Sequence, residues 1–99
     1  MITICLRDLN TSPCEMIVEV KRDVKSDWDI MSDRQRINAK YDAFEEFTKL
    51  ARAAIPIQTA GKNVDVFISL YENQATFPIP QEFFQLIADA GWSVKFDIN

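Results

Sequence analysis

Apolar and polar side chains alternate over several short stretches of the chain, a period of two that predicts β-strands. Residues 2–6, ITICL, are β-branched and apolar, and residues 15–22, EMIVEVKR, carry Glu19 and Lys21 opposite an apolar face. That apolar face consists of Met16, Val18 and Val20. The intervening DLNTSP is rich in turn formers, so we expect a hairpin or a short excursion there. Residues 27–31, DWDIM, alternate again and predict a third short strand.

Two further alternating stretches lie in the C-terminal half. Residues 64–71, VDVFISLY, have apolar side chains on both faces, which predicts a central strand that is covered on both sides. One face carries Val64, Val66, Ile68 and Leu70, and the other carries Phe67 and Tyr71. Residues 92–98, WSVKFDI, predict a last strand, in which Trp92, Val94, Phe96 and Ile98 alternate with Ser93, Lys95 and Asp97.

A helical period replaces the period of two in the middle of the chain. The segment from Ser32 to Ala54 has one apolar stripe with three- and four-residue steps, which predicts an amphipathic helix. The stripe consists of Ile37, Tyr41, Phe44, Phe47, Leu50, Ala51 and Ala54. Asp42 and Glu45 have the spacing of a capping box, so the regular part is expected to begin at Asp42. Pro56 is expected to end the helix, because it cannot donate a backbone hydrogen bond.

A second helix is predicted for QEFFQLIADA, residues 81–90. Pro80 suits its first turn and Gly91 suits its C-terminal cap. Its expected inward side chains are Phe83, Phe84, Leu86, Ile87 and Ala90. The polar stretch before it, YENQATFPIP, has two readings: a connection held extended by Pro78 and Pro80, or a binding loop.

Together these elements predict one α+β domain over residues 1–99. We expect one mixed or mostly antiparallel sheet of four to five strands, with both helices packed on one face. With 99 residues, two Gly and four Pro, the chain has the size of one domain and no flexible linker.

Composition and charge limit the expected binding partners and the expected cellular location of the protein. The net charge of −4 disfavours binding to nucleic acid or an anionic membrane and weakly favours a basic partner. The N-terminus has no basic leader and no apolar run approaches a membrane span, so the expected location is cytoplasmic. In that reducing compartment Cys5 and Cys14 should be free thiols, with Cys5 in the core.

The residues offer little catalytic chemistry. The chain has no His, and Gly61 and Gly91 stand alone, which argues against most hydrolases and against glycine-rich phosphate loops. Asp27 and Asp29 could share one strand face as an acid/base or metal pair, although a solvated acidic edge is the simpler interpretation. A basic cluster around Trp28 could bind single-stranded nucleic acid, but aspartates are interleaved with the basic residues. We therefore expect no catalytic residue, cofactor or metal.

Residues 26–99 resemble a bacterial family known only as a domain of unknown function. The shared features are a Trp-containing segment before the first long helix, a polar stretch with Pro after a strand, a Phe-rich helix and a last strand. That strand ends here in Asp97 and Ile98, with Asn99 where the family usually has Tyr. The segment between the first strand and Trp28 is shorter than in the family. Members resemble the immunity proteins of polymorphic toxins, including contact-dependent growth inhibition systems.

The resemblance and the missing catalytic groups lead us to expect a small non-catalytic binding protein. The first expectation is an immunity protein that neutralises a basic toxin domain by direct binding, as a monomer or homodimer. One alternative is a structural or regulatory protein that self-associates through a sheet edge; another is an enzyme or ligand binder using a face around Trp28, Tyr71 and Trp92. The expected partner-binding residues are Asp27, Trp28, Asp29, Asp33, Tyr71, Glu72 and Asn73.

Overall fold

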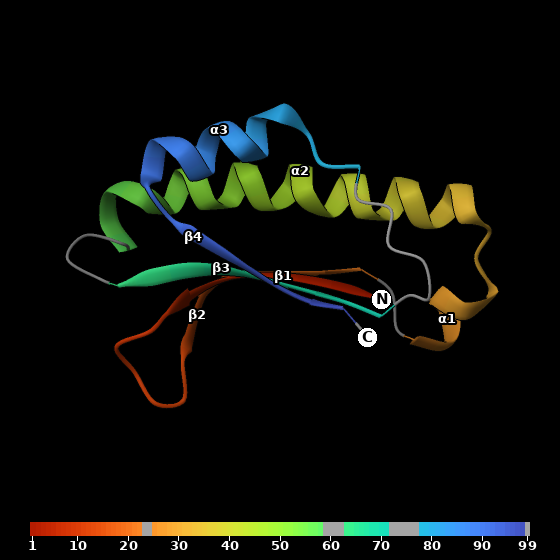
Figure 1. The fold of residues 1–99 in the computed structure, drawn as a ribbon, viewed down its shortest axis with the longest axis horizontal. Helices are drawn as coiled ribbons and strands as arrows, with labels where there is room; N and C mark the ends of the chain where they lie inside the picture. The colour runs from red at the N-terminus through yellow and green to blue at the C-terminus, as the bar shows by residue number, and fades with distance from the viewer. Residues whose placement is uncertain (23–24, 59–62, 72–77, 99) are drawn as a thin grey trace.

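The computed structural model describes residues 1–22, 25–58, 63–71 and 78–98, and these form an α+β fold of two layers (Figure 1). One layer is a mixed four-stranded sheet, and the other contains the two longer helices. The predicted fold class is therefore confirmed.

The described strands lie in the order β2-β1-β3-β4. β1 (Ile2–Asp8) is central and runs antiparallel to β2 (Glu15–Arg22) and to β3 (Val64–Leu70), whereas β4 (Ser93–Ile98) is parallel to β3. β1 and β2 form the predicted hairpin, with a register shift between Leu6 and Arg7.

The chain reaches β3 and β4 through two crossovers, each of which contains a helix. α2 (Asp33–Gln58) connects β2 to β3, and α3 (Gln81–Ala90) connects β3 to β4. β2, β3 and β4 all point in the same direction, and both connections move the same way across the sheet. Crossovers of the same hand must then put both helices on one face, as Figure 1 shows.

The core lies between that face and the two helices. Alternate residues of the three longest strands point into it, and α2 and α3 contribute aromatic side chains. Phe44 and Phe83 join the helices edge to face, with ring centroids 5.0 Å apart. The largest buried apolar side chains are Trp28, Phe44, Phe47, Phe83, Ile2, Ile4, Leu6, Ile68, Leu70, Leu86 and Val66.

α2 differs from its predicted bounds at both ends. It begins at Asp33 rather than Asp42, because the capping box is formed by Ser32 and Gln35. It continues past Pro56 to Gln58, so the expectation that Pro56 ends it was wrong. Proline removes one backbone hydrogen bond, but its φ of about −65° is helical and allows the helix to continue.

The predicted apolar stripe of α2 is only partly buried. Its members Phe44, Phe47, Ala51 and Ala54 are buried, together with Ala43, which the predicted stripe did not include. Ile37, Tyr41 and Leu50 lie on the flanks of the helix and are 37%, 40% and 45% exposed. A 26-residue helix is about 39 Å long, whereas a strand of seven residues spans about 24 Å, so α2 extends beyond the sheet (Figure 1).

The segment predicted as a third short strand is a helix, α1 (Lys25–Ile30). Only Trp28 of its described side chains is buried. The alternation of Trp28 and Ile30 with aspartates is too short to distinguish a strand from a helix, and Ile30 lies on the exposed side of α1.

α3 keeps its predicted bounds and its predicted C-terminal cap but not its whole predicted face. Pro80 is the N-cap, and Gly91 has a left-handed φ of 69° and donates its N–H to the Ile87 carbonyl. Phe83 and Leu86 are buried and Ile87 is packed against the core, but Phe84 is 57% exposed. The expectation that Phe84 points inward was wrong, because it lies about 100° around the helix from Phe83.

β3 was predicted to be covered on both sides, but α2 and α3 both lie on one face of the sheet, as predicted for the two helices, and no described helix covers the other face (Figure 1). The opposite face contains an ion pair of Arg7 with Asp65, whose carboxylate has no exposed surface. Arg7 also lies over the Phe67 ring, 4.4 Å from its centroid. Asp65, a buried and paired carboxylate, thus lies on the face of β3 that carries Phe67.

Candidate functional site

Four of the predicted partner-binding residues, Asp27, Trp28, Asp29 and Asp33, lie where α1 turns into α2. Together with Ile30, we call this region the α1 corner. Trp28 is the only one of these residues inside the core, with 1% of its surface exposed. Its Nε1 is buried without a hydrogen-bond partner in the described part of the chain. Trp28 therefore anchors the corner, and the expectation that its side chain is exposed was wrong.

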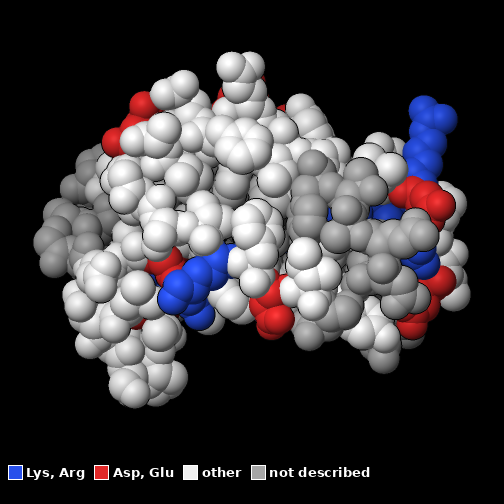
Figure 2. Space-filling model, in the orientation of Figure 1, with Lys and Arg blue, Asp and Glu red and all other residues white. Residues whose placement is uncertain are grey.

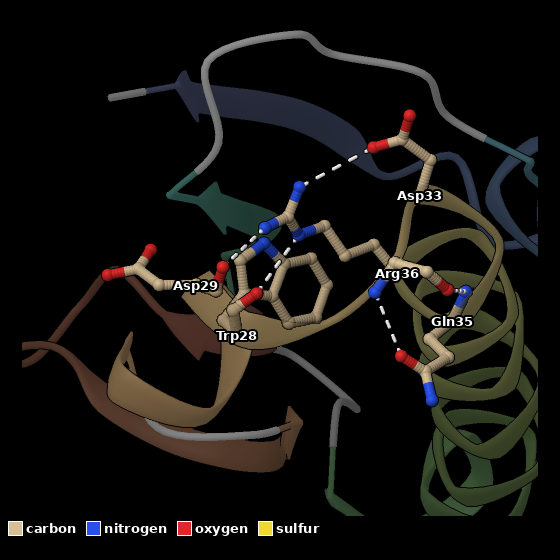
Figure 3. A network of polar contacts seen from close by, with 6 residues as sticks. Trp28, Asp29, Asp33, Gln35 and Arg36 are labelled. Carbon is tan, nitrogen blue, oxygen red and sulfur yellow. Dashed lines mark hydrogen bonds and ion pairs between the residues drawn. The ribbon is translucent and has the colours of Figure 1, made fainter.

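Arg36 of α2 holds this corner in place by contacts with three oxygen atoms (Figure 3). Its Nε donates to the Trp28 carbonyl at 3.0 Å, and its terminal nitrogen donates to the Asp29 carbonyl, also at 3.0 Å. A third contact joins Arg36 to the Asp33 carboxylate at 3.5 Å. Because carbonyls at the end of a helix have no partner within the helix, the guanidinium closes α1 while holding it against α2.

The capping box at the start of α2 adds a second constraint. The Ser32 hydroxyl accepts a hydrogen bond from the Gln35 N–H at 3.2 Å, and the Gln35 side chain accepts one from the Ser32 N–H at 2.8 Å. Both contacts lie between the α1 corner and the first turn of α2. The S-x-x-Q spacing is a recognisable sequence signal, and it was missed in favour of Asp42 and Glu45.

The outer surface of the corner is acidic with an apolar centre. Ile30 is 84% exposed, more than any other large hydrophobic residue among the described ones. Asp27 and Asp29 are exposed as well, and the Asp33 side chain is 95% exposed. In Figure 3 the Asp29 carboxylate points away from Arg36. Figure 2 also shows Lys and Arg side chains at this end of the molecule, so the surface is mixed in charge rather than uniformly acidic.

Tyr71 directly follows β3 at the edge of this region. β3 ends on the side of the sheet where α1 lies (Figure 1), and the Tyr71 N–H donates to the Met1 carbonyl at 2.9 Å. Tyr71 is 36% exposed. Glu72 and Asn73, the other two expected contact residues, lie outside the described residues, as does most of the polar stretch 71–80.

The α1 corner forms neither the carboxylate pair nor the ligand-binding face that the sequence offered as alternatives. Asp27 and Asp29 lie on a helix, where residues two apart point about 200° away from each other, so they do not form a carboxylate pair. Trp28 is buried and does not form a ligand-binding face with Tyr71 and Trp92. Within the described ranges, no group of three His, Cys, Asp or Glu residues could hold a metal ion.

Cys5 is a buried thiol on β1, as expected, and Cys14 is also a free cysteine. Burial raises the pKa of the Cys5 thiol to about 11, and the nearby negative charge of Glu19 contributes in the same direction. Since the thiolate is the nucleophile, Cys5 is unreactive at neutral pH.

A second surface feature, which the sequence reading missed, lies between β2 and α2. It is an open groove of about 370 Å³, lined by Ile17, Val18, Glu19, Leu50, Ala53 and Ala54. Leu50 forms part of the groove wall and is exposed, although the sequence pattern placed it in the apolar stripe of the helix. The groove offers apolar contact but only one charged side chain, which gives it no recognisable chemical selectivity.

None of the described helices has the length and apolarity needed to cross a membrane. Comparison with protein-family models, with curated proteins and with solved structures found no match. The resemblance to the bacterial family of unknown function therefore stays a prediction.

Proposed function

We propose that this chain is a non-catalytic protein-binding domain that neutralises a basic toxin domain by covering it. In this proposal the α1 corner is the contact surface. The supporting observation is Ile30, which is 84% exposed on a corner whose backbone is locked by Arg36 and by the Ser32 and Gln35 capping box. Exposed apolar side chains on preorganised backbone bind with a small loss of conformational entropy.

The carboxylates around Ile30 define the chemistry of the partner. Asp27, Asp29 and Asp33 are exposed, and Arg36 neutralises part of this charge through Asp33. A partner with a basic surface and an apolar pocket would desolvate Ile30 at the centre of the contact and pair with carboxylates at its rim. Rim charges mainly accelerate encounter, and a buried apolar anchor mainly slows dissociation.

The test compares two double variants that change the net charge equally. Asp27→Lys with Asp29→Lys reverses the charge of the corner, and Asp42→Lys with Glu45→Lys does the same on exposed positions of α2 outside it. The partner is the toxin-like product of an adjacent open reading frame, and association is followed by biolayer interferometry at low salt. We expect association to slow by about tenfold or more for the corner variant only.

A third variant, Ile30→Asp, should accelerate dissociation. The proposal is rejected if the unmodified chain does not bind, or if both double variants slow association equally, because that result reflects net charge alone. Far-UV circular dichroism of every variant establishes that the fold is intact.

A further inference from the structure

β4 is an edge strand, and its apolar side chains are unexpectedly exposed. Among the described strands it pairs only with β3, with Val94 opposite Val66 and Phe96 opposite Ile68. Val66 and Ile68 are fully buried, whereas Phe96 and Ile98 are 50% and 48% exposed. Phe96 and Ile98 thus lie on the same face as the buried residues of β3 but are half exposed, so the apolar row of the sheet continues to an exposed edge.

Among the described residues, this edge has few of the features that prevent strands from pairing with another chain. Proteins protect edges with charged side chains, Lys above all, and with proline, bulges, very short strands or a covering segment. β4 has six residues without proline, and its register with β3 is regular throughout. Its two charged residues, Lys95 and Asp97, have opposite signs and lie on the same face of the strand.

The adjacent flank of α3 is also uncharged. Asp89 contacts Arg52 of α2 at 3.8 Å, so that side of α3 faces α2. Phe84 lies about 140° around the helix from Asp89, on the flank away from α2. Phe84 and Ala88 are exposed there, and Figure 2 shows a surface with few charges between α3 and β4.

We propose that two copies of this chain associate by antiparallel pairing of their β4 strands about a two-fold axis at Phe96. In this register Phe96 faces its own copy, and Val94 of each chain faces Ile98 of the other. On the opposite face, Lys95 of each chain faces Asp97 of the other. Apolar and opposite-charge pairs directly across an antiparallel ladder are stabilising, and each occurs here by symmetry.

Neighbouring registers do not have this complementarity. A two-fold axis at Lys95 would put the two Lys95 side chains opposite each other, and an axis at Asp97 would do the same with the two carboxylates. Like charges directly opposite each other destabilise a strand pair. A shift by one residue would exchange the two faces of the strand and place apolar side chains beside charged ones. The alternating signs therefore favour the register centred on Phe96 over those centred on Lys95 and Asp97.

The proposed pairing joins two four-stranded sheets into one continuous sheet of eight strands, with all long helices on the same face. The uncharged flanks of the two α3 helices then face each other across the axis. This contact would cover Phe84, Phe96 and Ile98, which are large exposed apolar residues of this side of the molecule. It does not rest on the proposed toxin contact.

A charge exchange tests the register. Sedimentation velocity over about 1 to 500 μM should show a concentration-dependent dimer for the unmodified chain. Asp97→Lys and Lys95→Asp should each weaken self-association by about tenfold or more, and an equimolar mixture of the two variants should restore a dimer. The chain carrying both substitutions keeps the net charge and should also dimerise. Since Lys95 also contacts Asp65 at 3.8 Å, Asp97→Lys is the variant that leaves this ion pair in place.

Cross-linking supplies an independent distance test in a Cys14→Ser background. Phe96→Cys places the two sulfurs across the axis, where paired residues are about 5 Å apart, and should give a disulfide-linked dimer under mild oxidation. Ile98→Cys is the matched control, because its two copies would be about 14 Å apart. A chain that stays monomeric at 500 μM, equal cross-linking of both variants, or a dimer that is insensitive to the charge exchange would overturn the proposal.

Discussion

Arg7 and Asp65 form the most constrained polar contact among the described residues. Two hydrogen bonds of 2.8 Å and 2.7 Å join the guanidinium to both carboxylate oxygens. Lys95 lies 3.8 Å from the same carboxylate. These hydrogen bonds, followed by the charge of Arg7, hold the pKa of Asp65 below its usual range, although burial opposes the shift; the pKa of Arg7 is raised by the same pairing. Asp65 is therefore charged in the folded protein and depends on Arg7 to remain so.

Asp65→Asn should lower the free energy of unfolding at pH 7 by about 3 to 5 kcal/mol, because it leaves Arg7 without its partner. A carboxyl group with a depressed folded pKa stabilises the fold above its unfolded pKa of about 3.9, and this contribution is lost as the pH falls towards the folded value. The difference between the two proteins should therefore shrink on acidification from pH 5 to below pH 3.

Urea unfolding at several pH values measures this difference, with Asp42→Asn at an exposed position of α2 as the control. A difference that stays constant down to the lowest pH would show that the charge of Asp65 does not stabilise the fold.

At the scale of the element, α3 illustrates how two adjacent and identical residues have different roles. The Phe83 ring is 5.0 Å from the Phe44 centroid and 6.0 Å from the Phe47 centroid, so it connects α3 to α2. The Phe84 and Phe83 rings lie edge to face with their centroids 6.0 Å apart, and Phe84 is on the exposed flank of the helix. The helix is closed by the left-handed Gly91, which directs the chain into β4.

Phe83→Ala should destabilise the protein by about 3 to 5 kcal/mol, since it removes a fully buried ring and leaves a cavity. Phe84→Ala should cost about 1 kcal/mol in the monomer, because more than half of the Phe84 surface stays in water on folding. Chemical denaturation at low protein concentration measures both. Similar losses at the two positions would mean that Phe84 contributes to the monomer core.

The whole molecule is held by one hydrophobic cluster rather than by a covalent cross-link. The cluster includes side chains from β1, β2, β3, α1, α2 and α3. Both cysteines are free, with Cys5 buried on β1 and Cys14 before β2. An all-apolar cluster that spans most elements predicts a single cooperative unfolding transition.

Addition of a reductant should leave the Tm unchanged, because no disulfide constrains the unfolded chain. A native disulfide would contribute about 2 to 4 kcal/mol, which corresponds to a shift of roughly 10 °C or more in a domain of this size. Scanning calorimetry with and without reductant measures this, and Cys14→Ser should unfold at the same temperature as the unmodified chain. A large decrease of the Tm in reductant would contradict free thiols.

Local chemistry determined much of the fold directly from the sequence. Alternation predicted β1, β2, β3 and β4 close to their observed positions, because the pleat puts successive side chains on opposite faces. Helical spacing and Gly91 predicted α3, including its end. These features depend on residues that are close together in the chain.

Tertiary structure alone decided which of these apolar residues are covered. Ile98 and Phe84 follow the same patterns as their buried neighbours, but they lie at an edge strand and on a helix flank that no described element covers. Trp28 was expected at the surface and instead anchors α1, and Asp65 is buried because Arg7, 58 residues away in the chain, pairs with it. A pattern along the chain specifies the direction of a side chain, whereas its burial depends on what packs against it from distant parts of the sequence.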